Sequence, residues 1–196
     1  HGLATQVSRR YRGGLAFQTA YTFGKAIDRS GFPEEVGNIE REKGPAGHDR
    51  RHSLKLNAIW EIPFRSDRAL LEALLGGWQI NAVTVYESGP PFSVVCNLPY
   101  PRCDFNADGQ SGERVNVRRT DLGRPSREQW LAGVLSAADY SLPAAGTLST
   151  QPRNAFTGPA YFNTDLSVVK SVRIPWQDGR SATLQVRVEA FNVFNA

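Results

Sequence analysis

The sequence predicts an all-β fold, namely a segment of an antiparallel transmembrane β-barrel. Apolar and polar residues alternate with a period of two, which is typical of strands that have one apolar face. About six such stretches occur, and most are longer than the five or six residues common in soluble proteins. The connections between them are alternately short and long, as they are in outer-membrane barrels. These three observations together favour strands that cross a membrane.

The composition is that of a folded domain. The chain has 196 residues, of which 40% are hydrophobic and 21% charged, with 18 Gly, 12 Pro and 2 Cys. These proportions exclude a collagen, a coiled coil, a disulfide-dense mini-protein and a disordered tail. Since no run of about 18 apolar residues occurs, a transmembrane helix is excluded as well. The net charge is +4, but acidic and basic residues are interleaved, so we expect no nucleic-acid partner.

Each strand is predicted from its own alternation. The clearest stretch is Leu15–Lys25, in which Leu15, Phe17 and Tyr21 alternate with small or polar residues. A tilted strand crosses the hydrocarbon core with about 9 to 11 residues, so these lengths fit a membrane span. The same pattern predicts five further strands, over Ala4–Arg10, Ser53–Phe64, Trp78–Glu87, Phe162–Val169 and Leu184–Ala190.

The connections predict a topology. The short ones cover Tyr11–Gly14, Arg65–Gly76 and Pro175–Ser181, and we expect them to be periplasmic turns. The long ones, residues 28–51 and 89–160, are polar and rich in Gly and Pro, so we expect extracellular loops of irregular structure. A short helix is predicted near Ser126–Val134, because Ser126 and Glu128 suit its first turn.

The polar faces of the strands predict a barrel lumen. Opposite charges on adjacent strands more often form cross-strand pairs than acid and base catalysts. No nucleophile elbow, phosphate loop or zincin motif occurs, so we do not expect an enzyme. The residues expected to face the lumen are Lys55, Asn57, Glu61, Gln79, Asn81, Glu87, Asp165, Arg173, Arg187 and Glu189.

A candidate calcium turn lies in the second long loop. Asp104, Asn106 and Asp108 place side-chain oxygens at alternate positions before Gly109, as in the first half of a calcium loop. An EF-hand would need a Glu where this chain has Val115, and Glu113 is two residues early. The candidate ligands are therefore Asp104, Asn106, Asp108 and Glu113. We expect that no cofactor is required. The alternatives for residues 104–113 are therefore a Ca²⁺ site and an Asx-rich surface turn.

Cys96 and Cys103 enclose six residues of the same loop. Their spacing is not C-x-x-C and no second Cys pair or neighbouring His accompanies them, so a zinc site is unsupported. We expect a disulfide, because an extracellular loop lies on the oxidising side of the cell envelope. The alternative is two free thiols.

Six short strings carry a resemblance to a known family. Together they resemble the C-terminal part of the barrel of TonB-dependent outer-membrane receptors, in the subtype with an N-terminal carboxypeptidase-regulatory-like domain. The strings, in chain order, are YTFGKAID (21–28), DRRHSL (49–54), GWQI (77–80), SGPPF (88–92), GPAYFNTDLS (158–167) and RVEAFNVFN (187–195).

The resemblance implies a location, partners and a structural cluster. It implies the outer membrane of a Gram-negative type of cell, with lipid, a plug domain, the TonB complex and an unidentified ligand as partners. Residues 1–196 would be part of one barrel domain that is incomplete here and has two open sheet edges. Asp49, Arg51 and His52 match a family string, and we expect them to form a hydrogen-bonded cluster where the next strand begins.

Two alternatives remain open for the function. One is a secreted or surface β-sandwich, an adhesin or glycan-binding module, in which the aromatic residues would simply form the core. The other is a passive channel of the porin kind.

Overall fold

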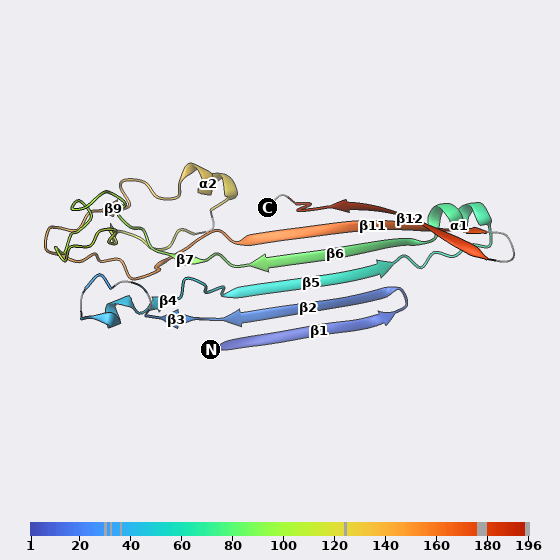
Figure 1. Cartoon of the computed structure of the whole chain (residues 1–196), viewed down its shortest axis with the longest axis horizontal. Helices are drawn as coiled ribbons and strands as arrows, with labels where there is room; N and C mark the ends of the chain where they lie inside the picture. Colours follow the sequence, from blue (N-terminus) through green and yellow to red (C-terminus); the bar gives the residue numbers. More distant parts are fainter. Residues whose placement is uncertain (30, 32, 36, 124, 176–179, 195–196) are drawn as a thin grey trace. The chain divides into compact units, whose positions relative to one another are not determined.

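Six long strands form one antiparallel sheet in a computed structural model, which describes residues 1–29, 31, 33–35, 37–123, 125–175 and 180–194. The order of the strands in the sheet follows the chain (Figure 1). The strands are β1 (Gly2–Arg12), β2 (Leu15–Gly24), β5 (His52–Glu61), β6 (Trp78–Glu87), β11 (Tyr161–Pro175) and β12 (Ser181–Ala190). The prediction of an all-β chain with six long strands is therefore confirmed.

The chain divides into two compact units. The sheet unit comprises Leu3–Phe23, His52–Glu87 and Tyr161–Ala196 and contains nearly all of the six long strands. The loop unit comprises His1–Gly2, Gly24–Arg51 and Ser88–Ala160, and thus contains most of both long connections.

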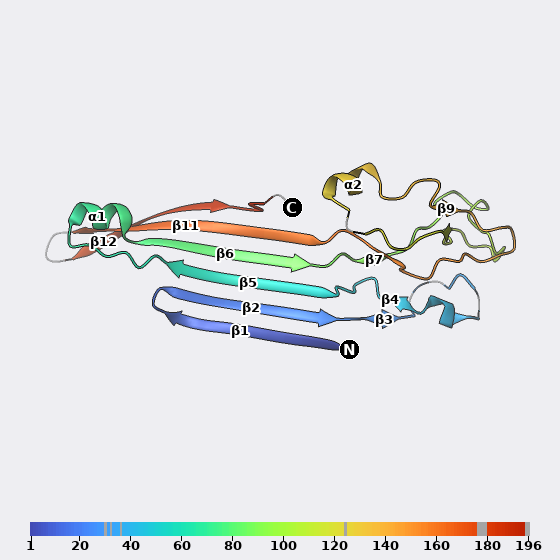
Figure 2. The ribbon, with the colours of Figure 1, turned by 180° about the vertical axis from the view of Figure 1, so that it is seen from behind.

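The sheet is open, with β1 and β12 at its edges. Each edge strand has one neighbour, and every residue of both strands is exposed. Figure 2 shows the same sheet from behind. Outside this sheet the described strands form only two-stranded pairs, so the described residues lack the second large sheet that a β-sandwich requires.

Several strand boundaries differ from the prediction, and two of them have a clear physical reason. β11 continues to Pro175 instead of ending at Val169, because the alternation persists and Val172 pairs with Leu184 of β12. β5 ends at Glu61 instead of Phe64, because Pro63 has no N–H to donate to a ladder.

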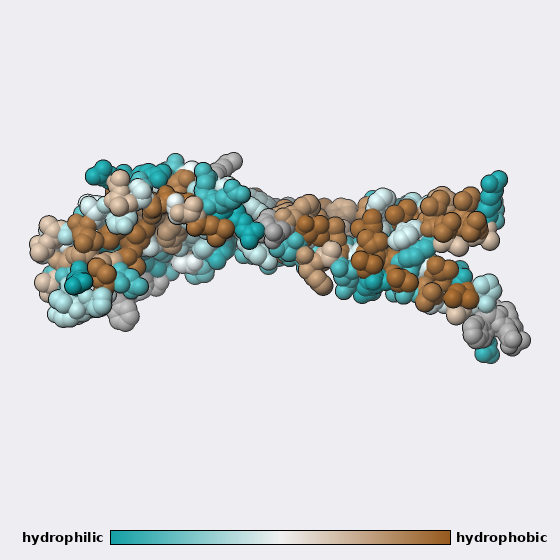
Figure 3. All heavy atoms as spheres, turned by 90° about the horizontal axis from the view of Figure 1, so that it is seen from above, coloured by the Kyte–Doolittle hydropathy of each residue, from teal (hydrophilic) through white to brown (hydrophobic). Residues whose placement is uncertain are grey.

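The link between β5 and β6 contains a helix, α1 (Ala69–Leu75), where the sequence predicted only a turn. Its sequence ALLEALL consists of strong helix formers, so a helical signal was present. Leu70 and Leu74 of α1 are exposed, and the space-filling view shows hydrophobic residues at the molecular surface (Figure 3). Among the described residues, no helix is long and apolar enough to cross a membrane.

The loop unit is mostly irregular, as its composition predicted. The predicted helix is present as α2 (Arg127–Ala132), where Ser126 and Gln129 form a capping box. In the interior of the loop unit, Phe92 stacks on Phe156 with the ring centroids 5.3 Å apart. The remaining elements are β3 (Ile27–Asp28), η1 (Ile39–Glu42), β4 (Gly44–Pro45), β7 (Pro91–Phe92), β8 (Asn116–Val117), β9 (Tyr140–Ser141) and β10 (Phe156–Thr157).

Candidate functional site

One face of the sheet carries the polar residues. Residues directly opposite each other on neighbouring strands lie on the same face. Asn57 pairs with Val83, and Val83 pairs with Asp165, so these three side chains share a face. The register places all ten residues that were predicted to face a lumen on this polar face: Lys55, Asn57, Glu61, Gln79, Asn81, Glu87, Asp165, Arg173, Arg187 and Glu189.

The opposite face is mostly apolar, with Lys170, which pairs with Trp78 and Val186, as a charged exception. Its middle holds small and aliphatic side chains, and the hydroxyls of Thr84 and Thr164 lie 3.1 Å apart, so each satisfies the other. Trp60 and Trp78 lie towards the end of the sheet with the short connections, whereas Tyr86 and Phe162 lie towards the other end. Aromatic residues gather in this way at the two interfaces of a membrane barrel. Other members of the apolar face are Leu54, Leu56, Ala58, Ile80, Ala82, Leu166, Val168, Leu184, Val186 and Val188.

The long connections both leave the sheet at one end. Phe23 pairs with His52 at the end of the β2–β5 ladder, and Glu87 pairs with Tyr161 at the end of the β6–β11 ladder. The ladder between β5 and β6 pairs Ser53 with Glu87, so these four chain positions belong to the same end. The short connections leave from the opposite end.

In the loop unit, three carboxylates of the predicted calcium turn come together. One oxygen from each of Asp104, Asp108 and Glu113 lies within 4.8 Å of the others. The turn is tight: the amide of Asp108 donates to Asp104 Oδ1 and to Asn106 Oδ1, both at 3.0 Å. Asn106 therefore directs its amide oxygen into the turn formed by the two aspartates. Glu113 does not occupy the position of the EF-hand Glu, but the fold of the loop brings its carboxylate close to those of Asp104 and Asp108.

Glu113 differs from the two aspartates because it is buried, with 7% of its surface exposed. Its Oε2 accepts a hydrogen bond from the amide of Phe105 at 2.8 Å. Its Oε1 is buried and has no hydrogen-bond partner among the described residues. Burial raises the pKa of the Glu113 carboxyl, and the charges of Glu34 and Asp108 raise it further, against the opposing effect of the Phe105 and Asn106 amides.

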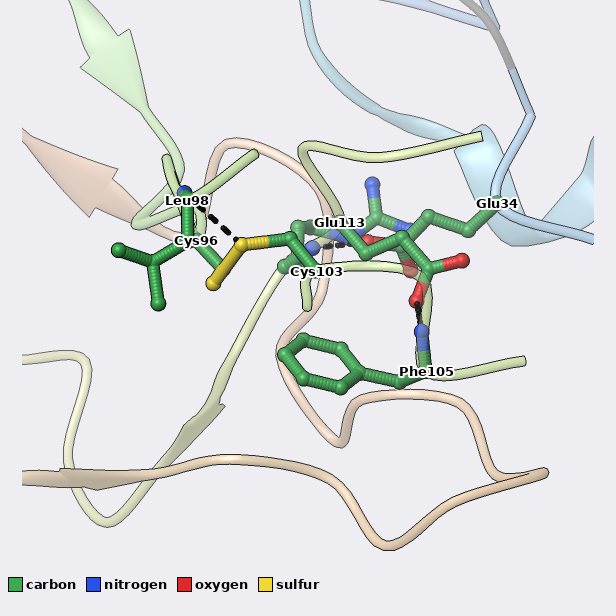
Figure 4. Close-up of a disulfide and its surroundings, with 7 residues drawn as sticks. Glu34, Cys96, Leu98, Cys103, Phe105 and Glu113 are labelled. Atoms are coloured by element: carbon green, nitrogen blue, oxygen red, sulfur yellow. Dashed lines mark hydrogen bonds and ion pairs between the residues drawn. A yellow bond between two sulfur atoms is a disulfide. The ribbon is translucent and has the colours of Figure 1, made fainter. Parts of the chain in front are cut away.

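A disulfide joins Cys96 to Cys103, with the two Cα atoms 5.6 Å apart (Figure 4). Cys103 is fully buried, and its Sγ accepts a hydrogen bond from the amide of Leu98. The disulfide belongs to a small apolar cluster, in which Phe105 and Val115 are the other buried members. Asp104 directly follows Cys103, and the amide of Cys96 donates to the carbonyl of Glu113 at 2.9 Å. The disulfide thus connects the backbone segments that present the carboxylates.

A buried ion-pair cluster lies beside this site and was not predicted from the sequence. Arg114 binds Glu42 through two hydrogen bonds of 2.8 and 2.9 Å and also contacts Glu34 at 2.8 Å. Burial alone would raise the pKa of Glu42, but the hydrogen bond and charge of Arg114 outweigh it and hold that pKa below its usual value. No local signal could have found this cluster, since Glu42 and Arg114 are 72 residues apart.

The three residues of the predicted structural cluster have the following contacts. Asp49 is buried, its Oδ1 accepts from the amide of Ala26 at 2.9 Å, and Arg51 lies 3.9 Å from its other oxygen. His52 Nδ1 lies 2.8 Å from the hydroxyl of Tyr21, and its ring also packs against Phe23. Asp49 and Arg51 thus contact each other in the loop unit, whereas these contacts of His52 are made in the sheet unit.

Comparison with known proteins gives the family. A family model described as an outer membrane beta barrel domain matches residues 1–196. The chain belongs to this family. No curated protein and no solved structure matches it.

Membership explains why the two faces differ. In an outer membrane beta-barrel domain one side of the sheet meets lipid and the other meets the interior, so apolar and polar residues must alternate along each strand. The six long strands form an open sheet and do not close into a barrel among the described residues. Membership of this family indicates that the protein is located in an outer membrane.

Proposed function

We propose that the chain is part of the barrel of a TonB-dependent receptor that binds a ligand outside a Gram-negative type of cell and takes it up. The six short strings between Tyr21 and Asn195 that resemble this family support the TonB-dependent subtype with an N-terminal carboxypeptidase-regulatory-like domain. The family match supports the coarser assignment to an outer-membrane barrel.

One observation carries the proposal: the sheet separates polar from apolar residues by face, and long from short connections by end. In this proposal the apolar face contacts membrane lipid, and the polar face lines the lumen. There, residues such as Lys55, Asp165 and Arg187 contact a plug domain or a solute. The open edges at β1 and β12 pair with further strands of the intact barrel, because unpaired backbone groups cannot remain in lipid.

The long loops make the first contact with the ligand in this proposal. Residues 28–51 and 89–160 lie outside the cell, and the short connections lie in the periplasm, where TonB acts on the plug. The chain has no catalytic role and binds no nucleic acid. Its function is recognition and passage, for which the loops and the polar face supply the contacts.

The test is whether the intact protein engages TonB. We expect the purified protein, folded in detergent, to bind the periplasmic domain of TonB in a pull-down assay. The unrelated periplasmic domain of another inner-membrane protein serves as the control bait. Failure to bind TonB under conditions in which a known TonB-dependent receptor binds it would contradict the proposal.

A conductance measurement separates this proposal from a passive channel. A plugged receptor inserted into a planar lipid bilayer should show little steady conductance, since its lumen is occupied. A porin-like channel would instead show stable, ohmic steps without TonB. Such steps from the intact protein would favour the channel alternative.

A further inference from the structure

We propose that Asp104, Asn106, Asp108 and Glu113 bind one Ca²⁺ ion in the loop unit. The proposal concerns the residues of the loop itself, and it stands whether or not the barrel depends on TonB. It starts from the three carboxylates that the fold gathers within 4.8 Å, one of which comes from beyond the local turn.

The buried oxygen of Glu113 is the observation that points to a ligand. Exposed acidic turns are common and need no ion, because water satisfies their oxygens. Glu113 is 7% exposed, however, and its Oε1 has no hydrogen-bond partner among the described residues. Leaving a buried charged group unsatisfied is costly, whereas a divalent cation between it and the aspartates would offset most of their combined negative charge. The carboxylate is held in place by the Phe105 amide through its other oxygen.

The donor set suits calcium. All four side chains offer oxygen, which is the ligand that Ca²⁺ prefers, and an ion with bonds of 2.3 to 2.6 Å spans oxygens up to roughly 5 Å apart. The oxygens of Asp104, Asp108 and Glu113 lie within that span. Mg²⁺ demands shorter bonds in a near-octahedral arrangement and keeps several waters. Three carboxylates on one small loop therefore favour the larger ion.

The surrounding fold holds the donors before an ion arrives. Asp104 is adjacent to Cys103, and the Glu113 carbonyl accepts from the amide of Cys96, so the disulfide ties both segments together (Figure 4). Gly109 has a φ of +89°, a conformation that L residues rarely adopt, and it lets the chain turn directly after Asp108. Arg114, the residue after Glu113, forms ion pairs with Glu34 and Glu42. These contacts belong to the buried ion-pair cluster described above.

The first experiment titrates the intact protein, folded in detergent, with calcium chloride in a calorimeter. We expect one site per chain with a dissociation constant roughly in the range of extracellular calcium modules, about 10⁻⁴ to 10⁻³ M. Magnesium chloride at the same concentrations should bind at least tenfold more weakly. Absence of a calcium signal would overturn the proposal and would mean that water satisfies Glu113.

Isosteric variants locate the ion. Asp104→Asn and Asp108→Asn should each weaken calcium binding at least tenfold, and so should Glu113→Gln, which keeps an acceptor for the Phe105 amide. Asp121→Asn is the matched control, because Asp121 is an exposed aspartate of the same long loop, where it accepts from the amide of Gly123. Equal affinity in the wild type and in the Asp104 and Asp108 variants would overturn the proposal.

Hydrogen exchange gives a readout that is independent of the binding heat. Calcium should slow exchange of the amides that donate into the site, such as those of Phe105, Asp108 and Gly109, at least tenfold, and EGTA should reverse the effect. The Glu113→Gln variant should show no such slowing. If calcium slows exchange equally in that variant, the ion acts elsewhere and this site is wrong.

Discussion

Arg114 and Glu42 form a two-point ion pair, with Nη1 to Oε2 at 2.8 Å and Nη2 to Oε1 at 2.9 Å, in a position where both side chains are almost fully buried. The pair joins the first long loop, which contains Glu42, to the second long loop, which contains Arg114. Arg114 also contacts Glu34, so one guanidinium holds two carboxylates of the first connection. This arrangement makes the loop unit sensitive to changes of charge at these positions.

Glu42→Gln should destabilise the loop unit by about 3 kcal/mol, the lower end of the range for removing one partner of a buried pair, because Arg114 keeps Glu34. The amides of Cys96 and Val115 pair residues 94–96 with residues 113–115 beside Arg114, within the second long connection, and hydrogen exchange at these amides measures the local free energy of opening. Glu40→Gln is the matched control in the same short helix: its pair with Arg29 is exposed and should contribute less than about 1 kcal/mol. Equal effects of the two substitutions would contradict the prediction.

The same ion pair predicts a pH dependence. The pKa of Glu42 in the folded protein lies below its ordinary value of 4.5, because Arg114 outweighs the effect of burial. Ionised Glu42 therefore contributes stability that is fully present above about pH 4.5 and is lost as the pH falls through the lowered pKa. Exchange at the Cys96 amide, corrected for its intrinsic pH dependence, should show this loss in the wild type. Glu42→Gln should lack this contribution, and parallel acid profiles would show that another group is responsible.

Charge on the apolar face should be costly. Leu56→Arg in the intact protein should destabilise the barrel by about 2 to 4 kcal/mol, because the side chain would meet the middle of the lipid bilayer. Asn57→Arg is the control, since Asn57 is the next residue on the same strand and lies on the polar face. Unfolding in urea from lipid vesicles measures both. Equal tolerance of the two substitutions would contradict the assignment of the faces.

Protease added outside intact cells should cut within residues 28–51 or 89–160. These segments are mostly irregular, while the turn at Tyr11–Gly14 and the link at Pro175–Ser181, which lies partly outside the described residues, should be spared. The reason is that both long connections leave one end of the sheet. Mass spectrometry of the fragments identifies the cut sites. Cleavage at the short connections alone would mean that the sheet is inserted in the opposite direction.

The strands could be predicted from the sequence because a strand's alternation is a local pattern. Leu54, Leu56 and Trp60 show their shared face by spacing alone, and cross-strand pairing then follows from the order of the chain. Where local rules compete, the prediction was wrong: Pro63 ends β5 early, and α1 forms where only a turn was expected.

The candidate site was only partly predictable. Asp104, Asn106 and Asp108 could be recognised by their spacing, and Cys96 and Cys103 by their number and location. The burial of Glu113 depends on the packing of Phe105 and on the pairing of residue 113 with residue 96, which no sequence period encodes. The cluster around Arg114 requires contact between residues far apart in the chain. Such contacts arise from tertiary packing and leave no trace in hydrophobic alternation.

The pairing of Glu87 with Tyr161 has a consequence for how such proteins diversify. The residues on either side of the second long loop are fixed as neighbours by a ladder that continues from this pair to Trp78 and Lys170. The entropy of closing a loop rises only with the logarithm of its length, about 0.6 kcal/mol for each doubling. Insertions, deletions or whole grafted segments between these two residues would therefore leave the register of the wall intact. The length and sequence of the second long loop can thus change while β6 and β11 keep the same pairing.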